Sequence, residues 1–570
     1  MSGISQSDRY QRLAAARKEL TGPGAMFEIV RAEVLGRSNL VFKNAPENVR
    51  VVWEETRRFG NRPYLVYNDE TISYAEAHRQ VDNVASWLAA HGVSKGDRVG
   101  IAMRNYPEWM LVYWACLASG ITAVGFNAWW TAEEMAYALG DSRPLFLFVD
   151  DERLDRAREA LSANPQTQLI GVRTERETPG GLRWDMLVRQ SGTMPDVEIE
   201  PDLDACIFYT SGTTGSPKGA RLTHRGCVST LFNQLFSGAC TTLASGTVPV
   251  APVEPVVLIT TPLFHVTANN CGVYPVTHAG GKVVLMYRWE PGEALRLIAK
   301  ERVTRLSGVP LMSRELIQHP DFAKTDTSSL LALSGGGAQV PPDLVLQIAD
   351  MGKTARPSTG YGMTETCGVI TSVTGEFFVG KPDSAGPFLP NYEVKCIDDA
   401  GAVVAQGGIG ELWVRGSSVI KGYLNKPEAT QEAIVDGWLR TGDVAWIDED
   451  GFIFIVDRKK DMVLRGGENV YCAEVEAALY RHAAVAECCV FGVPDERLGE
   501  EVGAAVYLRP GEHACEEDLR DICRQHIARH KVPRYVWLMD QPLPQNANGK
   551  FLKRDLRELL MRQLADGNAS

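Results

Sequence analysis

An apolar segment that runs into a loop of glycines and hydroxyl residues constrains this chain more than any other feature. Residues 205–208 (Ala-Cys-Ile-Phe) are typical of a short buried strand. They lead into residues 209–219, Tyr-Thr-Ser-Gly-Thr-Thr-Gly-Ser-Pro-Lys-Gly, where Lys218 is the only charged side chain. Glycines let backbone N–H groups approach an anion closely, and hydroxyls and a lysine add donors and positive charge. The pattern therefore predicts a loop that holds a polyphosphate.

Two other interpretations of this loop compete with phosphate binding. Clusters of glycine, serine and threonine are common in surface loops, and composition alone leaves that interpretation open. A Walker-type P-loop is excluded, because Gly212 and Gly215 are too close for GxxxxGK[ST] and Gly219 stands where a hydroxyl residue should follow the lysine. The loop is thus directed at phosphate without being a P-loop.

Length and charge limit the class of protein. A chain of 570 residues exceeds one ordinary hydrophobic core, so at least two domains are expected. Hydrophobic residues make up 45% and charged residues 23%, which is typical of a globular protein. The net charge of −12 leaves no basic footprint for nucleic acid, although a local site can still bind an anionic substrate.

Cysteine and histidine usage indicates the compartment. The twelve cysteines contain no CxxC pair and the ten histidines no HExxH, so neither a zinc site nor a disulfide framework is expected. Residues 1–20 carry charges throughout and lack the apolar core of a secretory signal. These features favour a reducing compartment and a cytoplasmic location.

The uncharged stretch 109–132 is long enough to span a bilayer. However, Ser119 and Gly120 divide it, and three polar side chains would lie in lipid. A buried helix over 107–117, closed by a glycine, and a buried strand over 121–127 explain the stretch better. We therefore expect no integral membrane segment.

Strands and helices alternate along much of the chain. The patterns predict a strand over 64–68, a helix over 73–90 with Ser73 as N-cap, and a strand over 98–103. We expect an α/β fold with helices on both faces of a sheet. Further strands are predicted at 256–260, 283–286 and 305–308, and a small β-rich subdomain over 386–441 with strands 392–397, 411–414 and 420–423.

A GxSxG pattern at residues 92–96 raises the alternative of a serine hydrolase or thioesterase. The nucleophile elbow of those enzymes needs a strand before the serine and a helix after it. Here the predicted helix precedes Ser94 and a strand follows, so an exposed turn is favoured.

Two more glycine-rich turns follow predicted strands. Residues 331–338 (Leu-Ala-Leu-Ser-Gly-Gly-Gly-Ala) make a tight connection or bring backbone against a flat ligand. Residues 358–365 (Ser-Thr-Gly-Tyr-Gly-Met-Thr-Glu) offer the Tyr361 ring for a purine, the Thr364 hydroxyl for phosphate and the Glu365 carboxylate for Mg²⁺. A glutamate there could also simply begin a helix.

Charges between apolar strands mark an expected boundary. After the predicted strand 452–456, Asp-Arg-Lys-Lys-Asp (457–461) reads as an exposed linker. The remaining residues, to about 560, alternate as a compact αβ domain, with helices at 473–479 and 516–530 and strands at 486–493, 502–508 and 534–539. We predict an N-terminal domain over 1–456, a hinge over 457–460 and a C-terminal domain over 461–570.

Taken together, the loop 209–219, Pro-Leu-Phe-His (262–265), the turns at 331–338 and 358–365, Thr-Gly-Asp (441–443), the 457–461 linker and Asn-Gly-Lys (548–550) resemble the motifs of the adenylate-forming superfamily. The resemblance extends over most of the chain and points to the acyl-CoA synthetase type. It implies a large N-terminal domain of several α/β and β-rich subdomains and a smaller, mobile α+β C-terminal domain.

The resemblance also implies roles for residues. Five catalytic residues would be Lys550, Thr364, Glu365, His265 and Lys218, with Glu365 and Thr210 facing Mg²⁺. ATP, its ribose and coenzyme A would be bound by residues of both predicted domains: Thr210, Ser211, Gly212, Thr213, Thr214, Gly215, Gly336, Gly337, Tyr361, Gly362, Asp443, Arg458, Lys460, Gly466 and Gly467. Asp443 could otherwise make a simple Asx-turn.

The implied reaction joins a carboxylic acid to coenzyme A through an acyl-adenylate, with Mg²⁺ and ATP and with release of pyrophosphate. The glycine pair Gly466-Gly467 would leave room for a pantetheine arm, which favours coenzyme A as acceptor. The acid is open among fatty, aromatic and cyclic acids, with a medium- to long-chain fatty acid as the default. Oligomeric state is also open, with a homodimer as one option.

Overall fold

The computed structural model describes residues 6–210, 217–246, 253–351, 354–466, 468–545 and 551–567. The chain divides into two compact units. The large unit comprises residues 1–394 and 414–439, and the small unit comprises 395–413 and 440–570. Since residues 440–456 fall in the small unit, the expected boundary at residue 456 and the hinge over 457–460 stay predictions.

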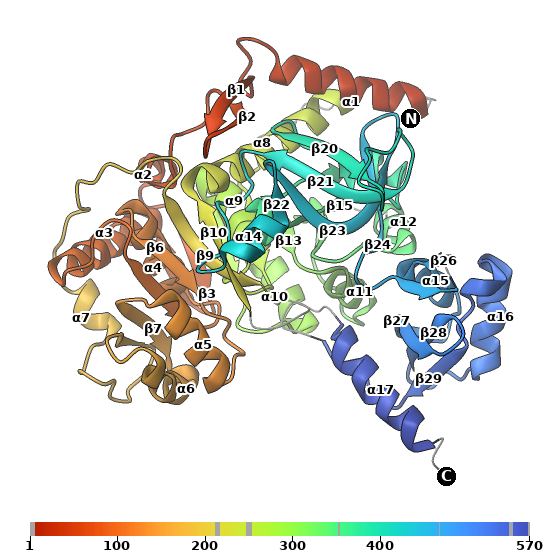
Figure 1. Ribbon diagram of the computed structural model, residues 1–570. Coiled ribbons are helices and arrows are strands. Elements are labelled where there is room, and N and C mark those ends of the chain that lie inside the picture. The colour runs from red at the N-terminus through yellow and green to blue at the C-terminus, as the bar shows by residue number, and fades with distance from the viewer. Residues whose placement is uncertain are drawn as a thin grey trace. The chain divides into compact units, whose positions relative to one another are not determined.

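The first sheet of the large unit carries the strand that enters the phosphate loop. Its order is β10-β9-β6-β5-β7-β8, and all neighbours are parallel except the pair β9 and β10 (Figure 1). The predicted strands at 98–103, 121–127 and 205–208 are confirmed. The bounds are β5 Arg98–Ala102, β6 Thr122–Gly125, β7 Phe146–Asp150, β8 Gln168–Val172, β9 Asp204–Thr210 and β10 Lys218–Thr223.

Local signals set the helices that cover this sheet. Helix α3 (Tyr74–Ala90) begins where the Ser73 hydroxyl accepts the Glu76 N–H at 3.2 Å, as the sequence predicts. Helix α4 (Pro107–Ala118) starts at a proline and is buried on all sides. Its chain then turns at Gly120, whose φ is +72°. In the described ranges, no helix is both long and apolar enough to cross a bilayer.

The second sheet places two glycine-rich turns side by side. Its order is β18-β15-β14-β13-β11-β12-β3-β4, with a parallel centre. Strands β14 and β15 run together to their carboxyl ends, where Gly336 pairs with Gly360. The bounds are β3 Pro63–Tyr67, β4 Glu70–Ser73, β11 Val256–Ile259, β12 Lys282–Leu285, β13 Arg305–Ser307, β14 Ala332–Gly336, β15 Arg356–Gly360 and β18 Val373–Thr374.

The predicted β-rich segment is confirmed in part. Strands β20 (Tyr392–Ile397), β21 (Gly410–Gly416) and β23 (Trp438–Ile447) form here, and β24 (Phe452–Arg458) pairs antiparallel with β23. The predicted strand over 420–423 is wrong. Its backbone amides serve other partners, since Ile420 donates to the Glu365 carbonyl at 3.0 Å and Lys421 to Arg221 at 3.1 Å.

The small unit contains the compact αβ pattern expected near the C-terminus. A sheet of order β26-β25-β28-β27, with β29 beside β28, packs against helices through valines such as Val475, Val490 and Val506. Helix α16 ends at His526 rather than residue 530, because Ile527 is already extended. The bounds are β25 Val463–Arg465, β26 Glu468–Val470, β27 Val485–Asp495, β28 Gly499–Leu508, β29 Tyr535–Met539, α15 Cys472–Leu479, α16 Glu516–His526 and α17 Lys553–Gly567.

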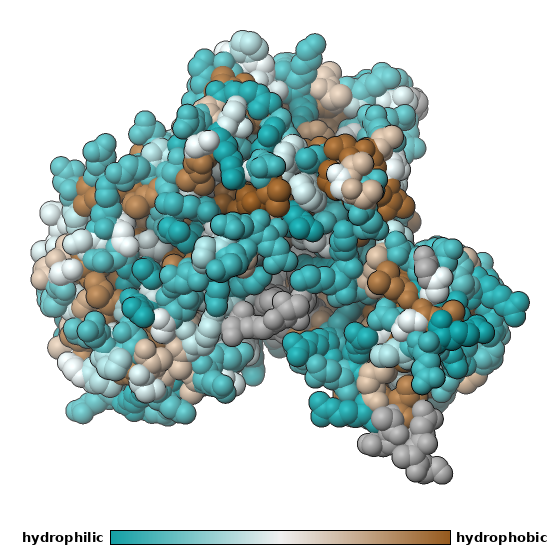
Figure 2. Space-filling view, in the orientation of Figure 1, coloured by the Kyte–Doolittle hydropathy of each residue, from teal (hydrophilic) through white to brown (hydrophobic). Residues whose placement is uncertain are grey.

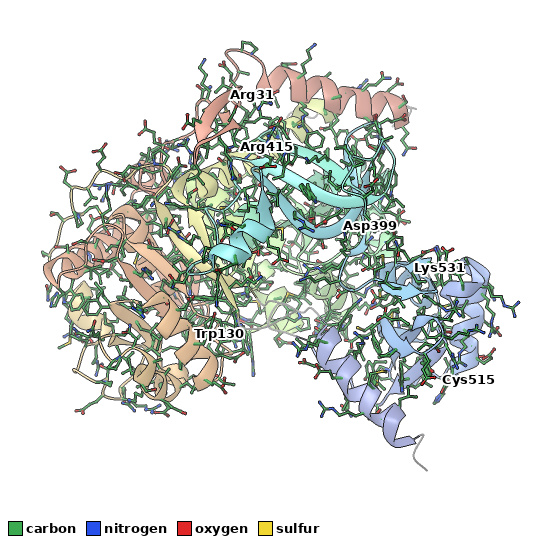
Figure 3. The ribbon with its side chains drawn as sticks, in the orientation of Figure 1. Arg31, Trp130, Asp399, Arg415, Cys515 and Lys531 are labelled. Carbon is green, nitrogen blue, oxygen red and sulfur yellow. The ribbon has the colours of Figure 1, made fainter. Side chains whose placement is uncertain are left out.

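The N-terminal residues cover part of the large unit. Helix α1 (Gln6–Thr21) lies along α8 (His224–Ser245), and the hairpin β1 (Ile29–Val34) and β2 (Arg37–Phe42) follows it (Figure 1). Arg31 of the hairpin and Arg415 of β21 both pair with Glu393 (Figure 3). Most of the surface visible in Figure 2 is hydrophilic.

The remaining elements are α2 Val49–Glu55, α5 Ala132–Ser142, α6 Leu154–Ala160, α7 Trp184–Val188, α9 Tyr274–His278, α10 Pro291–Glu301, α11 Pro310–Gln318, α12 Pro342–Asp350, α13 Glu376–Val379, α14 Pro427–Ala433, β16 Gly362–Met363, β17 Gly368–Val369, β19 Gly386–Pro387 and β22 Ile434–Val435.

Candidate active site

Two strand ends hold the termini of the phosphate-directed loop. Thr210, the last residue of β9, pairs with Lys218, the first of β10, and the Thr210 hydroxyl donates to the Lys218 carbonyl at 3.4 Å. The loop between them therefore begins and ends at one point on the sheet edge. The predicted site residues Ser211, Gly212, Thr213, Thr214 and Gly215 lie outside the described residues.

A half-buried tyrosine joins this loop to the predicted metal ligand. The Tyr423 hydroxyl donates to Oε1 of Glu365 at 2.7 Å, and the Lys218 ammonium lies 5.2 Å from the centre of the Tyr423 ring. Burial, together with the Glu365 carboxylate, raises the pKa of Tyr423, so the tyrosine is a neutral donor. Glu365 itself is 7% exposed. The structure thus brings Lys218 and Glu365 together around Tyr423.

Sequence reasoning missed Tyr423, which it placed in a strand. The segment instead makes one isolated antiparallel bridge beside β10, where Leu424 donates to the Gly219 carbonyl at 2.8 Å and Arg221 donates to the Gly422 carbonyl at 3.0 Å. These bonds set the tyrosine beside Glu365, 58 positions away in the chain. A tyrosine after a glycine, in a segment of low β-branched content, was the weak signal available.

A tight hairpin positions Thr364 and Glu365. Strands β16 and β17 approach so closely that a Cβ at Gly362 would lie 2.0 Å from the Gly368 carbonyl oxygen, so glycine is required there. Thr364 and Glu365 occupy the short 3₁₀ turn that joins the strands. At the start of the hairpin, the half-buried Tyr361 donates its backbone N–H to the Thr371 hydroxyl at 3.0 Å. This geometry places Thr364 and Glu365 on the turn and Tyr361 at the start of the same hairpin.

The glycines after β14 leave open space. A Cβ at Gly336 would meet its nearest neighbour, Cγ2 of Thr267, at 3.6 Å, and one at Gly337 would meet Val309 at 4.0 Å. Gly337 also has φ of +77°, which favours glycine. The backbone of both residues is therefore open to a flat ligand, and their role in binding one stays a prediction. Thr267 belongs to the segment that follows His265.

That segment is fastened by its two asparagines. Asn269 donates to the Leu263 carbonyl at 3.3 Å, and Asn270 donates to the Cys367 carbonyl at 2.9 Å. His265 begins the segment in a turn, with its ring 4.7 Å from that of Phe264. The asparagine donors thus hold backbone in place and tie the His265 segment to the Glu365 turn.

The small unit holds the predicted ribose ligands. Asp443 and Arg458 face each other across β23 and β24, and Nε of Arg458 lies 3.3 Å from Oδ1 of the buried Asp443. Lys460 is exposed in the turn after β24, and Gly466 has φ of +60°. Gly467 and Lys550 lie outside the described residues. The roles of all six stay predictions.

The donor set of the large unit fits Mg²⁺. Mg²⁺ keeps several waters and binds through one or two protein oxygens together with substrate phosphates. Glu365 supplies one fixed carboxylate and Thr210 a hydroxyl at the loop entrance, while the described residues contain no group of three or more His, Cys, Asp or Glu side chains suited to a metal. This set fits a metal that arrives with ATP.

The hydrolase alternative lacks its required geometry. Ser94 lies in an exposed turn after helix α3 and before strand β5, and its N–H donates to Asp97 at 2.8 Å. The strand-then-helix order of a nucleophile elbow is reversed. Ser94 is therefore a turn residue.

Known proteins share both the sequence and the fold. The family model of AMP-binding enzymes matches residues 52–424, and that of the AMP-binding enzyme C-terminal domain matches residues 474–550. A feruloyl-CoA synthase of an Amycolatopsis species is 36% identical, covering 85% of this chain and 93% of its own length. A long-chain-fatty-acid–CoA ligase of Bacillus subtilis is 30% identical, covering 89% and 93%.

A solved structure gives the same result in three dimensions. The O-succinylbenzoate coenzyme A synthetase of Bacillus subtilis, in complex with ATP and magnesium ion, superimposes with a TM-score of 0.76 at 30% identity. It covers 89% of this chain and 99% of its own. This chain therefore belongs to the AMP-binding enzyme family, as an AMP-forming acid–CoA ligase that uses ATP, Mg²⁺ and coenzyme A.

Proposed function

We propose that this ligase activates an acid with an apolar carbon chain, a medium- to long-chain fatty acid. The observation that carries the proposal is the use of Asn269 and Asn270. Their amide donors are engaged by backbone carbonyls, whereas both amide oxygens are buried without a hydrogen bond within the described residues. We assign this segment, residues 265–276, to the acyl pocket. Three of the other buried side chains there, Val266, Ala268 and Val273, are apolar and suit a hydrocarbon chain.

The first half-reaction converts the acid into a better electrophile. The acid's carboxylate attacks the α-phosphorus of ATP, a P–O bond forms, and pyrophosphate leaves with the electrons of the bond that breaks. Such a step needs positioning and charge stabilisation rather than covalent help from the protein. We assign the loop from Thr210 to Lys218 to the phosphates and the glycine turn at Gly336 and Gly337 to the adenine side.

Charge control falls to residues of both units. Mg²⁺ bound with ATP supplies positive charge at the phosphate oxygens. Glu365, oriented by Tyr423, would hold that ion, and Lys550 would stabilise charge between the carboxylate and the α-phosphate. Losing one donor of this kind typically costs about 3 kcal/mol of transition-state stabilisation.

The second half-reaction transfers the acyl group. The thiol of coenzyme A attacks the acyl carbon and loses its proton, a C–S bond forms, the acyl C–O bond of the adenylate breaks, and AMP leaves with the oxygen that came from the carboxylate. We assign Gly466 and Gly467 to the passage of the pantetheine arm, because neither has a side chain to obstruct it. Asp443 and Arg458 would contact the ribose.

A hydroxylated aromatic acid is a second candidate. The Thr230 hydroxyl is buried and makes no hydrogen bond within the described residues, and it lies beside Gly368, whose added Cβ would come 2.6 Å from Cγ2 of Thr230. A polar substituent of the acid would satisfy that hydroxyl. The relative named feruloyl-CoA synthase is also 36% identical.

An acid panel separates the candidates. The purified protein is assayed with ATP, Mg²⁺ and straight-chain acids of six to sixteen carbons or hydroxycinnamic acids, following ATP–pyrophosphate exchange and acyl-CoA formation. We expect the highest kcat/KM for a straight-chain acid. A higher value for a hydroxycinnamic acid selects the second candidate. Thiol release from acyl-CoA without ATP, and no exchange with any acid, would contradict the ligase assignment.

Location and assembly follow as smaller proposals. All twelve cysteines are free thiols, which supports a cytoplasmic location. A homodimer is tested by light scattering of the purified protein.

A further inference from the structure

The segment that carries Lys550 is closed at its base. Gln545 and Phe551 form an antiparallel bridge, and the Leu552 N–H donates to the Pro544 carbonyl at 2.9 Å. These contacts join the chain immediately before residue 546 to the chain immediately after residue 550. Whatever fixes this base therefore fixes the position from which Lys550 extends.

A glutamate of the small sheet fixes the incoming side. Glu487 of β27 accepts the Leu543 N–H at 2.7 Å through Oε2 and the Gln545 side-chain amide at 3.3 Å through Oε1. Both carboxylate oxygens are thus used on the two residues that lead into the segment.

An ion pair fixes the outgoing side. Lys553, the first residue of α17, places its ammonium 3.0 Å from Oε1 of Glu476 on α15, and the same oxygen accepts the Val490 N–H at 2.9 Å. The Lys553 and Glu476 side chains are 25% and 22% exposed. Burial opposes the charge, but Glu476 and neighbouring groups raise the pKa of Lys553 well above its usual value, so it stays protonated.

Helix α15 is also hydrogen-bonded to the 457–461 linker, which contains the expected hinge. Asp457 accepts the N–H of Cys472, the first residue of α15, and the Cys472 thiol donates to the Asp461 carbonyl at 2.9 Å. Helix α15 therefore contacts the hinge segment at one end and carries Glu476 in its middle. Helix α15 therefore connects the hinge residues to the base of the Lys550 segment.

We propose that Lys553 and Glu476 are positioning residues for adenylation, which hold the base of the Lys550 segment on helix α15. The proposal rests on the assignment of Lys550 in the proposed function. Neither residue touches substrate. Their ion pair sets the starting point of Lys550, and a displacement of about 1 Å in such a group is enough to cost much of the rate.

The chain offers a matched control on the same helix. Glu474, two positions before Glu476, pairs with Lys531 at 2.6 Å (Figure 3 labels Lys531), with exposures of 37% and 20%. Residues two apart on a helix face different directions, and Lys531 has no link to the base formed by residues 543–553 in the described contacts. Breaking this pair perturbs α15 without touching the Lys550 segment.

The experiment compares Lys553→Met, Lys531→Met and Lys550→Ala in the full-length protein. Thermal unfolding, ATP–pyrophosphate exchange and thioester formation from supplied acyl-adenylate are measured on each. We expect Lys553→Met to lower exchange at least tenfold and to change the thioester step less than twofold. Lys531→Met should lower the unfolding temperature similarly and leave both half-reactions within twofold.

A double variant tests whether Lys553 acts through Lys550. Adding Lys553→Met to Lys550→Ala should lower exchange by less than a further twofold, since the group being positioned is already gone. Additive losses, or equal behaviour of Lys553→Met and Lys531→Met, would overturn the proposal. If Lys553→Met does not fold, Glu476→Gln takes its place, because its amide oxygen can still accept the Val490 N–H.

The two levels of the proposal fail differently. Unchanged exchange in Lys550→Ala removes the catalytic assignment of Lys550 and, with it, the basis of the positioning role. Reduced exchange in Lys550→Ala but not in Lys553→Met or Glu476→Gln keeps the proposed function and rejects the positioning role alone.

Discussion

The large and small units fix their functional groups by different physical means. In the large unit, Glu365 is held by backbone pairing and by one neutral hydroxyl, that of Tyr423. In the small unit, the base of the Lys550 segment is held by the carboxylates of Glu476 and Glu487 and by the ammonium of Lys553. A hydrogen bond from a neutral hydroxyl to a buried carboxylate responds less to salt than a partly exposed ion pair does. We therefore expect the position of Glu365 in the large unit to change little with salt and pH, and the base of the Lys550 segment in the small unit to change more.

The largest effect is expected from the group that the small unit carries. Lys550→Ala should lower ATP–pyrophosphate exchange about a hundred- to a thousandfold, by analogy with the loss of one charge-stabilising donor. Thioester formation from supplied acyl-adenylate should change little, because that step does not need the lysine. Equal losses in both half-reactions, measured by quenched-flow assays, would erase the functional division between the units.

The next largest effect is expected from Glu365 in the large unit. Glu365→Gln keeps the size and the acceptor for Tyr423 but removes the negative charge that suits Mg²⁺. We expect exchange to fall roughly ten- to a hundredfold at limiting Mg²⁺ and to recover partly at high Mg²⁺. A titration of rate against Mg²⁺ concentration measures this. An unchanged titration would mean that Glu365 does not face the metal.

A smaller effect is expected from the hydroxyl that orients this carboxylate. Tyr423→Phe keeps the ring near Lys218 and removes one hydrogen bond to a charged acceptor, worth about 1.5 kcal/mol or more. The Mg²⁺ concentration for half-maximal exchange should rise about tenfold.

Tyr392→Phe is the control for that variant. The buried Tyr392 hydroxyl donates to the Thr366 carbonyl at 3.2 Å and so reaches the same turn without touching the carboxylate. It should lower thermal stability and leave the Mg²⁺ titration unchanged. Identical titrations for the two variants would mean that Tyr423 supports the fold and does not orient Glu365.

Local signals predicted the elements, and long-range pairings decided what they missed. Ser73 lies three residues before Glu76, so its cap was readable from sequence. The strand over 205–208 and the glycine turns were readable too, because each depends on neighbouring residues. Tyr423 was not, since its role comes from a bridge to β10 that sets it beside Glu365. An apolar, alternating pattern over 420–423 does not reveal whether the backbone amides of these residues pair within a β-ladder or bond to two separate segments.

The same reason explains the small unit. Residues 546–550 could be assigned from a motif, but the link from Lys553 to Glu476 spans two helices and cannot be read from either. Likewise, the sequence shows Asn269 and Asn270 as polar and cannot show that their donors are taken by carbonyls. Polarity is a property of a residue, whereas an unsatisfied donor is a property of the fold.

The smallest expected effect is a change of stability with pH, and it concerns the small unit. Burial raises the pKa of Asp457 from 3.8 to about 6, although the Lys553 ammonium and the N–H groups of Arg458 and Cys472 lower it, and Glu476 raises it further. Between about pH 4 and 6 the folded state then holds more protons than the unfolded state. Stability conferred by this site is therefore present below about pH 4 and is lost as pH rises to 6.

Asp457→Asn should remove that slope. Burial also raises the pKa values of Asp82 and Asp150 in the large unit, but both proteins contain these groups, so their contribution cancels in the difference between wild type and variant. Denaturant unfolding of both proteins from pH 4 to 7 should show the wild type losing stability relative to the variant as pH rises. A difference that is flat with pH would mean that Asp457 ionises freely in the folded protein. The small unit would then be as insensitive to pH at this site as we expect the large unit to be around Glu365.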